Sequence, residues 1–159
     1  MSLVKYNNNS ISAVTSAAAI PSGAMTHIKT LTASSSGTLS FVHGSNGVVL
    51  DNTYPIYVFK FINIHPSATS YFQFNASVDT GSNYNVTKTS TAFGAIHAED
   101  DSSPSLSYVG GSDLAQGTGV QRLTTGELDS GNADDNLGGT LHLFNPSSTT
   151  FVKHFISNV

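Results

Sequence analysis

The stretch IYVFKFINI, residues Ile56 to Ile64, decides the fold class of this chain. Alternate residues of an extended strand point to opposite faces of a sheet, and here Lys60 alone interrupts the apolar character of one face. A strand that is apolar on both faces is typical of the centre of a sheet or of a subunit contact. We therefore predict that this stretch is a central or contact strand, with Val58 and Phe59 as assembly contacts.

The same alternation predicts shorter strands on both sides of this stretch. They are expected at 27–32, 38–43, 48–50, 71–78, 84–91, 140–144 and 150–156. The Asn46-Gly47 pair predicts a tight turn, and turns at 79–83 and 145–148 predict two hairpins, 71–78 with 84–91 and 140–144 with 150–156. Residues 92–139 are rich in Gly, Asp and Ser, so we expect mostly loops, with one helical turn or a loop at 92–101 and a short strand near Leu123.

No segment of useful length has a helical period, and this absence disfavours an α/β fold. The sequence predicts an all-β fold, an antiparallel β-sandwich of jelly-roll or immunoglobulin-like type. One core suits a chain of 159 residues. We assign residues 23–159 to the sandwich and residues 1–22 to an N-terminal docking arm. The apolar residues of the arm that we expect to contact a partner are Val4, Tyr6, Ile11 and Val14.

Few side chains are charged: 10% of the residues, against about 25% in an average protein. The six Lys and Arg residues are scattered, which argues against nucleic acid as a partner. No apolar run approaches the length of about 20 residues that spans a bilayer, so we expect no membrane insertion. The start of the chain lacks the apolar core of a secretory signal, and the chain has no cysteine, so synthesis in a reducing cytoplasm is expected. Such a weakly charged surface suits a chain used within an assembly.

Motifs for catalysis are missing, since no GxSxG elbow, phosphate loop or cysteine nucleophile occurs. We predict that the chain is not an enzyme and needs no cofactor. Asp129, Asp134 and Asp135 faintly resemble a calcium loop, but a solvated acidic loop is the favoured interpretation. The six histidines form no HxH or HxxxH pair. Tyr84 and Tyr108 lie near turns, where they could stack on a sugar, although packing is the more common role of such residues.

Three long stretches resemble a family of small virion structural proteins from tailed phages of marine bacteria. They run from Lys5 to Gly44, from Tyr54 to Pro66 and from Leu143 to Ser157. The resemblance implies a component of the tail, a fibre or the capsid surface, made in the host cytoplasm, whose partners are other copies of itself and neighbouring virion proteins. Chains of this kind continue with further strands after the HFIS motif, whereas this one stops at Val159. We therefore expect an open sheet edge that a neighbouring subunit completes.

The leading prediction is a self-associating structural protein of a phage virion. A glycan-binding module is the alternative, in which loops between residues 92 and 139 recognise a host surface glycan, because recognition residues often lie on loops of a rigid scaffold.

Overall fold

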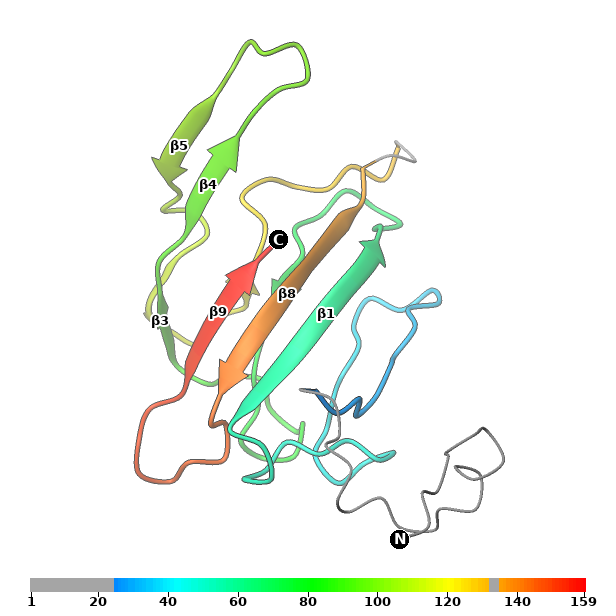
Figure 1. The fold of residues 1–159 in the computed structure, drawn as a ribbon, viewed down its shortest axis with the longest axis vertical. Coiled ribbons are helices and arrows are strands. Elements are labelled where there is room, and N and C mark those ends of the chain that lie inside the picture. Colours follow the sequence, from blue (N-terminus) through cyan, green and yellow to red (C-terminus); the bar gives the residue numbers. More distant parts are fainter. Residues whose placement is uncertain (1–24, 132–134) are drawn as a thin grey trace, which may run out of the picture.

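The computed structural model describes residues 25–131 and 135–159. All regular elements of this part are strands, which confirms the all-β prediction (Figure 1). The strands are β1 (Ile56–Ile64), β2 (Gln73–Phe74), β3 (Lys88–Ser90), β4 (Phe93–Ile96), β5 (Ser105–Tyr108), β6 (Leu114–Gly117), β7 (Gln121–Arg122), β8 (Leu137–Phe144) and β9 (His154–Asn158). They form a three-stranded sheet in the order β1-β8-β9 and the pairs β2-β7, β3-β6 and β4-β5, all antiparallel.

The three-stranded sheet has β8 at its centre. Val58 of β1 lies opposite His142 of β8, and His142 lies opposite Ile156 of β9. The register of β1 shifts between Phe61 and Ile64. Of the two predicted positions of β1, the central one is wrong, because β1 is an edge strand, and the subunit contact stays a prediction. One apolar face of β1 contributes to the core, and the other apolar face is part of an uncovered surface.

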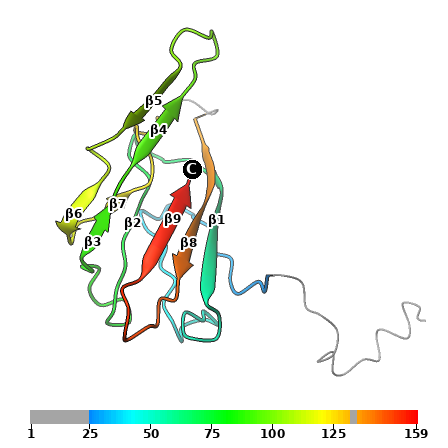
Figure 2. The same cartoon turned by 60° about the vertical axis from the view of Figure 1, so that its left-hand side comes forward.

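The core lies behind this sheet, on the face that carries Phe59 and Phe61 of β1. The ring of Phe41 meets Phe59 at 5.3 Å between centroids, and that of Phe72 meets Phe61 at 4.8 Å, both edge to face. Segment 25–50 and the β2-β7 pair thus cover the inner face of the sheet, and Figure 2 shows the two layers. The apolar side chains classed as buried among the described residues are Val48, Tyr57, Leu137 and Leu141.

The hairpin predicted near the end of the chain is confirmed as β8-β9, with Leu143 opposite Phe155. The Asn46-Gly47 turn is confirmed as well. Both residues have positive φ, 51° and 79°, and the amide of Val48 donates to the carbonyl of Ser45 at 3.0 Å.

The hairpin predicted between 71–78 and 84–91 is wrong, because β2 pairs with β7 and β3 pairs with β6. Polar side chains in the intervening segment bond its backbone and compete with a ladder. Asn75 Nδ2 donates to the carbonyl of Tyr84 at 2.6 Å, and the carboxylate of Asp79 accepts the amide of Asn83 at 2.8 Å.

Three further strand predictions are also wrong, since segments 27–32, 38–43 and 48–50 contain no strand. Conversely, the region 92–139, expected to be mostly loops, contains β4, β5, β6 and β7.

Candidate assembly surfaces

The outer face of the β1-β8-β9 sheet is an apolar surface. Its apolar and aromatic members are Ile56, Val58, Ile62, His142, Phe144 and Ile156. Ile62 is 78% exposed, Ile156 65% and Ile56 47%. Among the outward-facing residues of these three strands, Lys60 is the only Lys, Arg, Asp or Glu.

Cross-strand pairing makes two rows of this surface continuous. Val58, His142 and Ile156 form one row across the three strands, and Ile56, Phe144 and His154 form the next. The row on the other side, Lys60, Thr140 and Asn158, is polar and separates Ile62 from them. In Figure 1 the sheet faces the viewer, and no other described element lies in front of it. Contiguous exposed apolar surface of this kind marks interaction sites.

The edge of β1 that faces away from β8 is unpaired in the described part of the chain. Seven of its nine residues lie opposite residues of β8 on one side, and no backbone hydrogen bond reaches the other side from segment 25–50. A long apolar edge strand is a template for pairing with another chain. This edge borders the outer face, so the two features form one surface around β1.

The predicted contact residues Val58 and Phe59 point in opposite directions. Val58 lies on the outer face and is half-buried, whereas Phe59 packs on Phe41 in the inner layer. A role in assembly stays a prediction for both. Val4, Tyr6, Ile11 and Val14 lie outside the described residues.

Tyr84 and Tyr108 do not share a site. The hydroxyl of Tyr84 donates to Ser40 Oγ at 3.0 Å. The hydroxyl of Tyr108 donates to the carboxylate of Asp113, and this hydrogen bond raises the pKa of Tyr108. The contacts of the two tyrosines have no residue in common.

The β4-β5 hairpin carries an aromatic platform that the sequence did not reveal. Phe93 lies opposite Tyr108 and Ala95 opposite Leu106, so these four side chains share one face. The rings of Phe93 and Tyr108 meet at 5.6 Å, edge to face. Phe93 is 68% exposed, Leu106 79% and Tyr108 52%. The hairpin projects from the sandwich at its upper end in Figure 1.

The acidic loop is held by its own hydrogen bonds. Asp129 Oδ1 accepts bonds from Thr69 Oγ1 at 3.1 Å and from the amide of Gly131 at 2.9 Å, and these bonds lower the pKa of Asp129. Asp135 Oδ2 accepts the amide of Asp129. Asp134 lies outside the described residues. Across residues 25–131 and 135–159, no three His, Asp or Glu side chains gather as a metal site would require.

The chain matches no protein-family model, no curated protein and no solved structure. In its described part, no helix has the length and apolar character needed to cross a membrane.

Proposed function

We propose that this chain is a structural protein of a phage virion, made in the host cytoplasm, that binds copies of itself and neighbouring virion proteins through the outer face of the β1-β8-β9 sheet. The observation that carries the proposal is the continuous apolar surface on that sheet. The resemblance of three long stretches to virion proteins supports the setting, and the low charge of the whole chain supports an assembled state.

Covering the outer face is energetically favourable because it removes apolar side chains from water, and the cost is low because few charges lose their hydration. Burying an exposed Val or Ile side chain contributes about 1.5–3 kcal/mol. Lys60 is the one fixed charge on the face, and its long side chain can reach solvent at the border of a contact. A second sheet packs about 10 Å above the first and buries such a face completely.

The proposal predicts that Val58→Asp weakens self-association of the full chain, measured by light scattering at micromolar concentration. Val78→Asp is the matched control, because Val78 is 84% exposed and lies outside the sheet. Ile62→Asp is a second test at a position that is already 78% exposed, where a fold defect is least expected. A monodisperse monomer of the unmodified chain would contradict the proposal.

The proposed location in a phage virion can be tested separately from self-association. Mass spectrometry of purified particles of the phage that encodes the chain should detect it at a fixed number of copies per particle. Its absence from particles would exclude a virion role.

A glycan-binding module is the second candidate, favoured by the platform of Phe93, Leu106 and Tyr108 with the carboxylate of Asp113 beside it. Sugars stack on exposed aromatic rings while their hydroxyls bond polar groups nearby. A glycan array would show binding that Tyr108→Ala removes and that Tyr84→Ala, at a separate position, retains. No binding to any glycan would exclude this candidate.

A further inference from the structure

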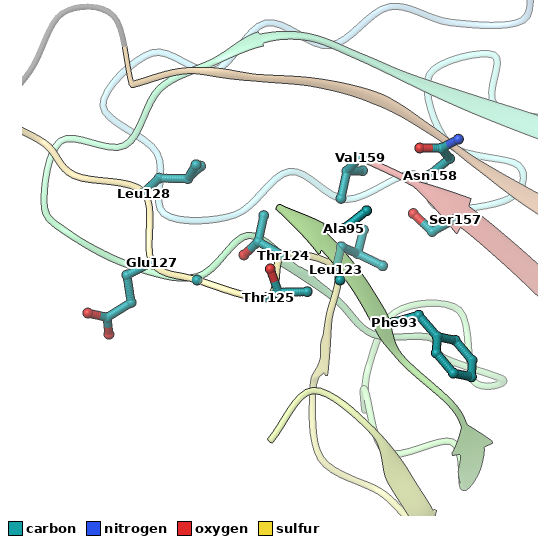
Figure 3. A pocket seen from close by; sticks show the side chains of 12 residues that line it. Phe93, Ala95, Leu123, Thr124, Thr125, Glu127, Leu128, Ser157, Asn158 and Val159 are labelled. Atoms are coloured by element: carbon teal, nitrogen blue, oxygen red, sulfur yellow. The ribbon is translucent and has the colours of Figure 1, made fainter. Parts of the chain in front are cut away.

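A continuous groove runs along the free edge of β9. Two hollows of about 350 and 440 Å³ share Phe93, Leu123, Thr125 and Ser157, so they join into one depression. One wall is formed by residues 153–159, the other by residues 89–95, and residues 121–128 contribute to the lining. Figure 3 shows Ser157 and Val159 approaching from β9, with Ala95 on β4 and Thr124 and Thr125 beside it.

Both walls of the groove are strand edges without partners. β9 pairs only with β8, β3 only with β6, and β4 only with β5. Among the described residues, no backbone hydrogen bond joins β9 to β3 or β4. An extended segment in the groove could therefore form ladder hydrogen bonds with its walls, which is the way peptides are added to exposed sheet edges.

The lining is preformed and admits small side chains. Gln121 Nε2 donates to the carbonyl of Ser112 at 2.7 Å, and Ser90 Oγ donates to Gln121 Oε1 at 2.6 Å, so the buried polar groups are paired without a ligand. Gly94, Ala95 and Gly126 line the hollow of about 350 Å³, beside larger side chains such as Leu123 and Val159. Small side chains such as Ala and Ser would let the backbone of an added segment approach the strand edges closely.

The docking arm contains such a segment. Residues 10–20, SISAVTSAAAI, have no charge, proline or glycine, so every amide can donate to a wall. At about 3.3 Å per residue, the seven-residue wall at 153–159 spans about 23 Å and the eleven-residue segment about 36 Å. The segment is therefore long enough to fill the groove.

The place where the described chain begins points to a neighbouring copy as the acceptor of the arm. The described chain begins at Met25, and segment 25–50 runs beside β1, while the groove lies beyond β9 at the opposite edge of the sheet (Figure 1). A donor at one edge and an acceptor at the other give a head-to-tail contact, which produces rings or filaments.

We infer that the groove along β9 binds residues 10–20 of a second copy as an added strand. This inference rests on the proposed self-association and names its partner segment. It predicts assembly by strand exchange through an edge, in addition to packing through the outer face.

Engineered disulfides test the inference in the full chain, which has no native cysteine. Ser157→Cys places a thiol in the groove and Val14→Cys places one in the arm. Under mild oxidation, a mixture of the two single variants should give a mixed dimer, and the double variant should give a ladder of multimers. Ser45→Cys, on an exposed turn, replaces Ser157→Cys in the matched control and should give only background cross-linking.

A charge in the arm provides a second readout. Ala13→Asp would bury a carboxylate in the groove and should lower the cross-linked fraction by about tenfold or more. Asn8→Asp adds the same charge outside the segment and should leave the fraction unchanged.

Two outcomes would overturn the inference. An internal disulfide in a monomeric double variant would show that the arm fills the groove of its own chain, and cross-linking no higher than in the Ser45→Cys control would show that it fills none. If light scattering still detects association in either case, the inference falls and the proposed function stands. If the chain is monomeric, both fall.

Discussion

The substitution Gly139→Ala tests how β9 closes against the central strand. A Cβ atom at Gly139 would lie 2.5 Å from the carbonyl oxygen of Asn158 and 2.8 Å from Cα of Val159. Backbone atoms cannot rotate away as a side chain can, so the end of β9 must move away from β8. Overpacking of this kind costs about 1–3 kcal/mol. For a chain of this size each kcal/mol lowers Tm by about 2–4 °C, so we expect a fall of about 2–12 °C.

Gly138→Ala is the matched control in the same strand. The nearest atom to a Cβ there is the carbonyl oxygen of Phe61 at 3.9 Å, an ordinary contact. Replacing glycine where alanine fits stabilises a protein by about 0.4–1 kcal/mol through the unfolded state, so Tm should hold or rise. Thermal unfolding followed by circular dichroism measures both. Equal melting temperatures for the two variants would mean that β9 does not end against Gly139, and the groove described above would lose one wall.

Three further substitutions test local features by urea unfolding. Hydrogen bonds from Ser77 and neighbouring groups lower the pKa of Asp79 from 3.8 to about 2. Because the folded-state pKa is the lower one, the stability it contributes is full above pH 3.8 and is lost as pH falls through about 2. Asp79→Asn should therefore be less stable than the unmodified chain at pH 7 and should match it only below about pH 2. Lys88 is 8% exposed and its Nζ donates to Asn75 Oδ1 and to the carbonyl of Val86; Lys88→Met removes both bonds, and because Asn75 Oδ1 still accepts the amide of Ala76, the main loss is at the carbonyl of Val86 and should cost about 1–3 kcal/mol. Tyr57→Phe removes a hydroxyl that donates to the carbonyl of Asp51 at 2.9 Å and should cost about 0.5–1.5 kcal/mol, whereas no change would show that water replaces it.

Local pattern predicts the bounds of a single strand and the pairing of strands that lie close in sequence. The bounds of β1 follow from alternation between two prolines, Pro55 and Pro66, and match the structure residue for residue. The β8-β9 hairpin follows from two alternating stretches around the turn at Asn145-Pro146. In both cases the information lies within about ten residues of the element.

Pairing between distant segments is not encoded in such a pattern. β2 pairs with β7, which lies almost fifty residues further on, and β3 pairs with β6 across the β4-β5 hairpin. Which edges meet depends on the closure of long loops and on competing side-chain bonds such as those of Asn75. The edge position of β1 cannot be predicted from its sequence either, because the sequence shows that both faces are apolar and does not show how many strands lie beside β1.

The same distinction applies to the candidate surfaces: local pattern predicts single positions, whereas residues that come together through pairing of distant segments are not predicted. Val58 was predicted from its strand and does lie on the exposed face, while its neighbour Phe59 points into the core, since alternation tells faces apart without saying which is covered. Phe93 and Tyr108 are fifteen positions apart, and only the pairing of β4 with β5 brings their rings together. The groove along β9 likewise requires residues from three separate segments.

The outer face and the groove meet on β9, where Ile156 belongs to both, but Val58 and the groove lie at opposite edges of the sheet, so the effects of substitutions at Val58 and in the arm should separate. Val58 is on β1, and the groove lies beyond β9, with β8 between them. Substitutions at distant sites without shared partners act additively. Val58→Asp should remove face packing and leave cross-linking of the arm to Ser157→Cys intact, whereas Ala13→Asp should do the reverse, and the double variant should be monomeric in light scattering. If either single substitution alone gives a monomer that also fails to cross-link, the two surfaces form one interface, and the arm must cross the outer face to reach its groove.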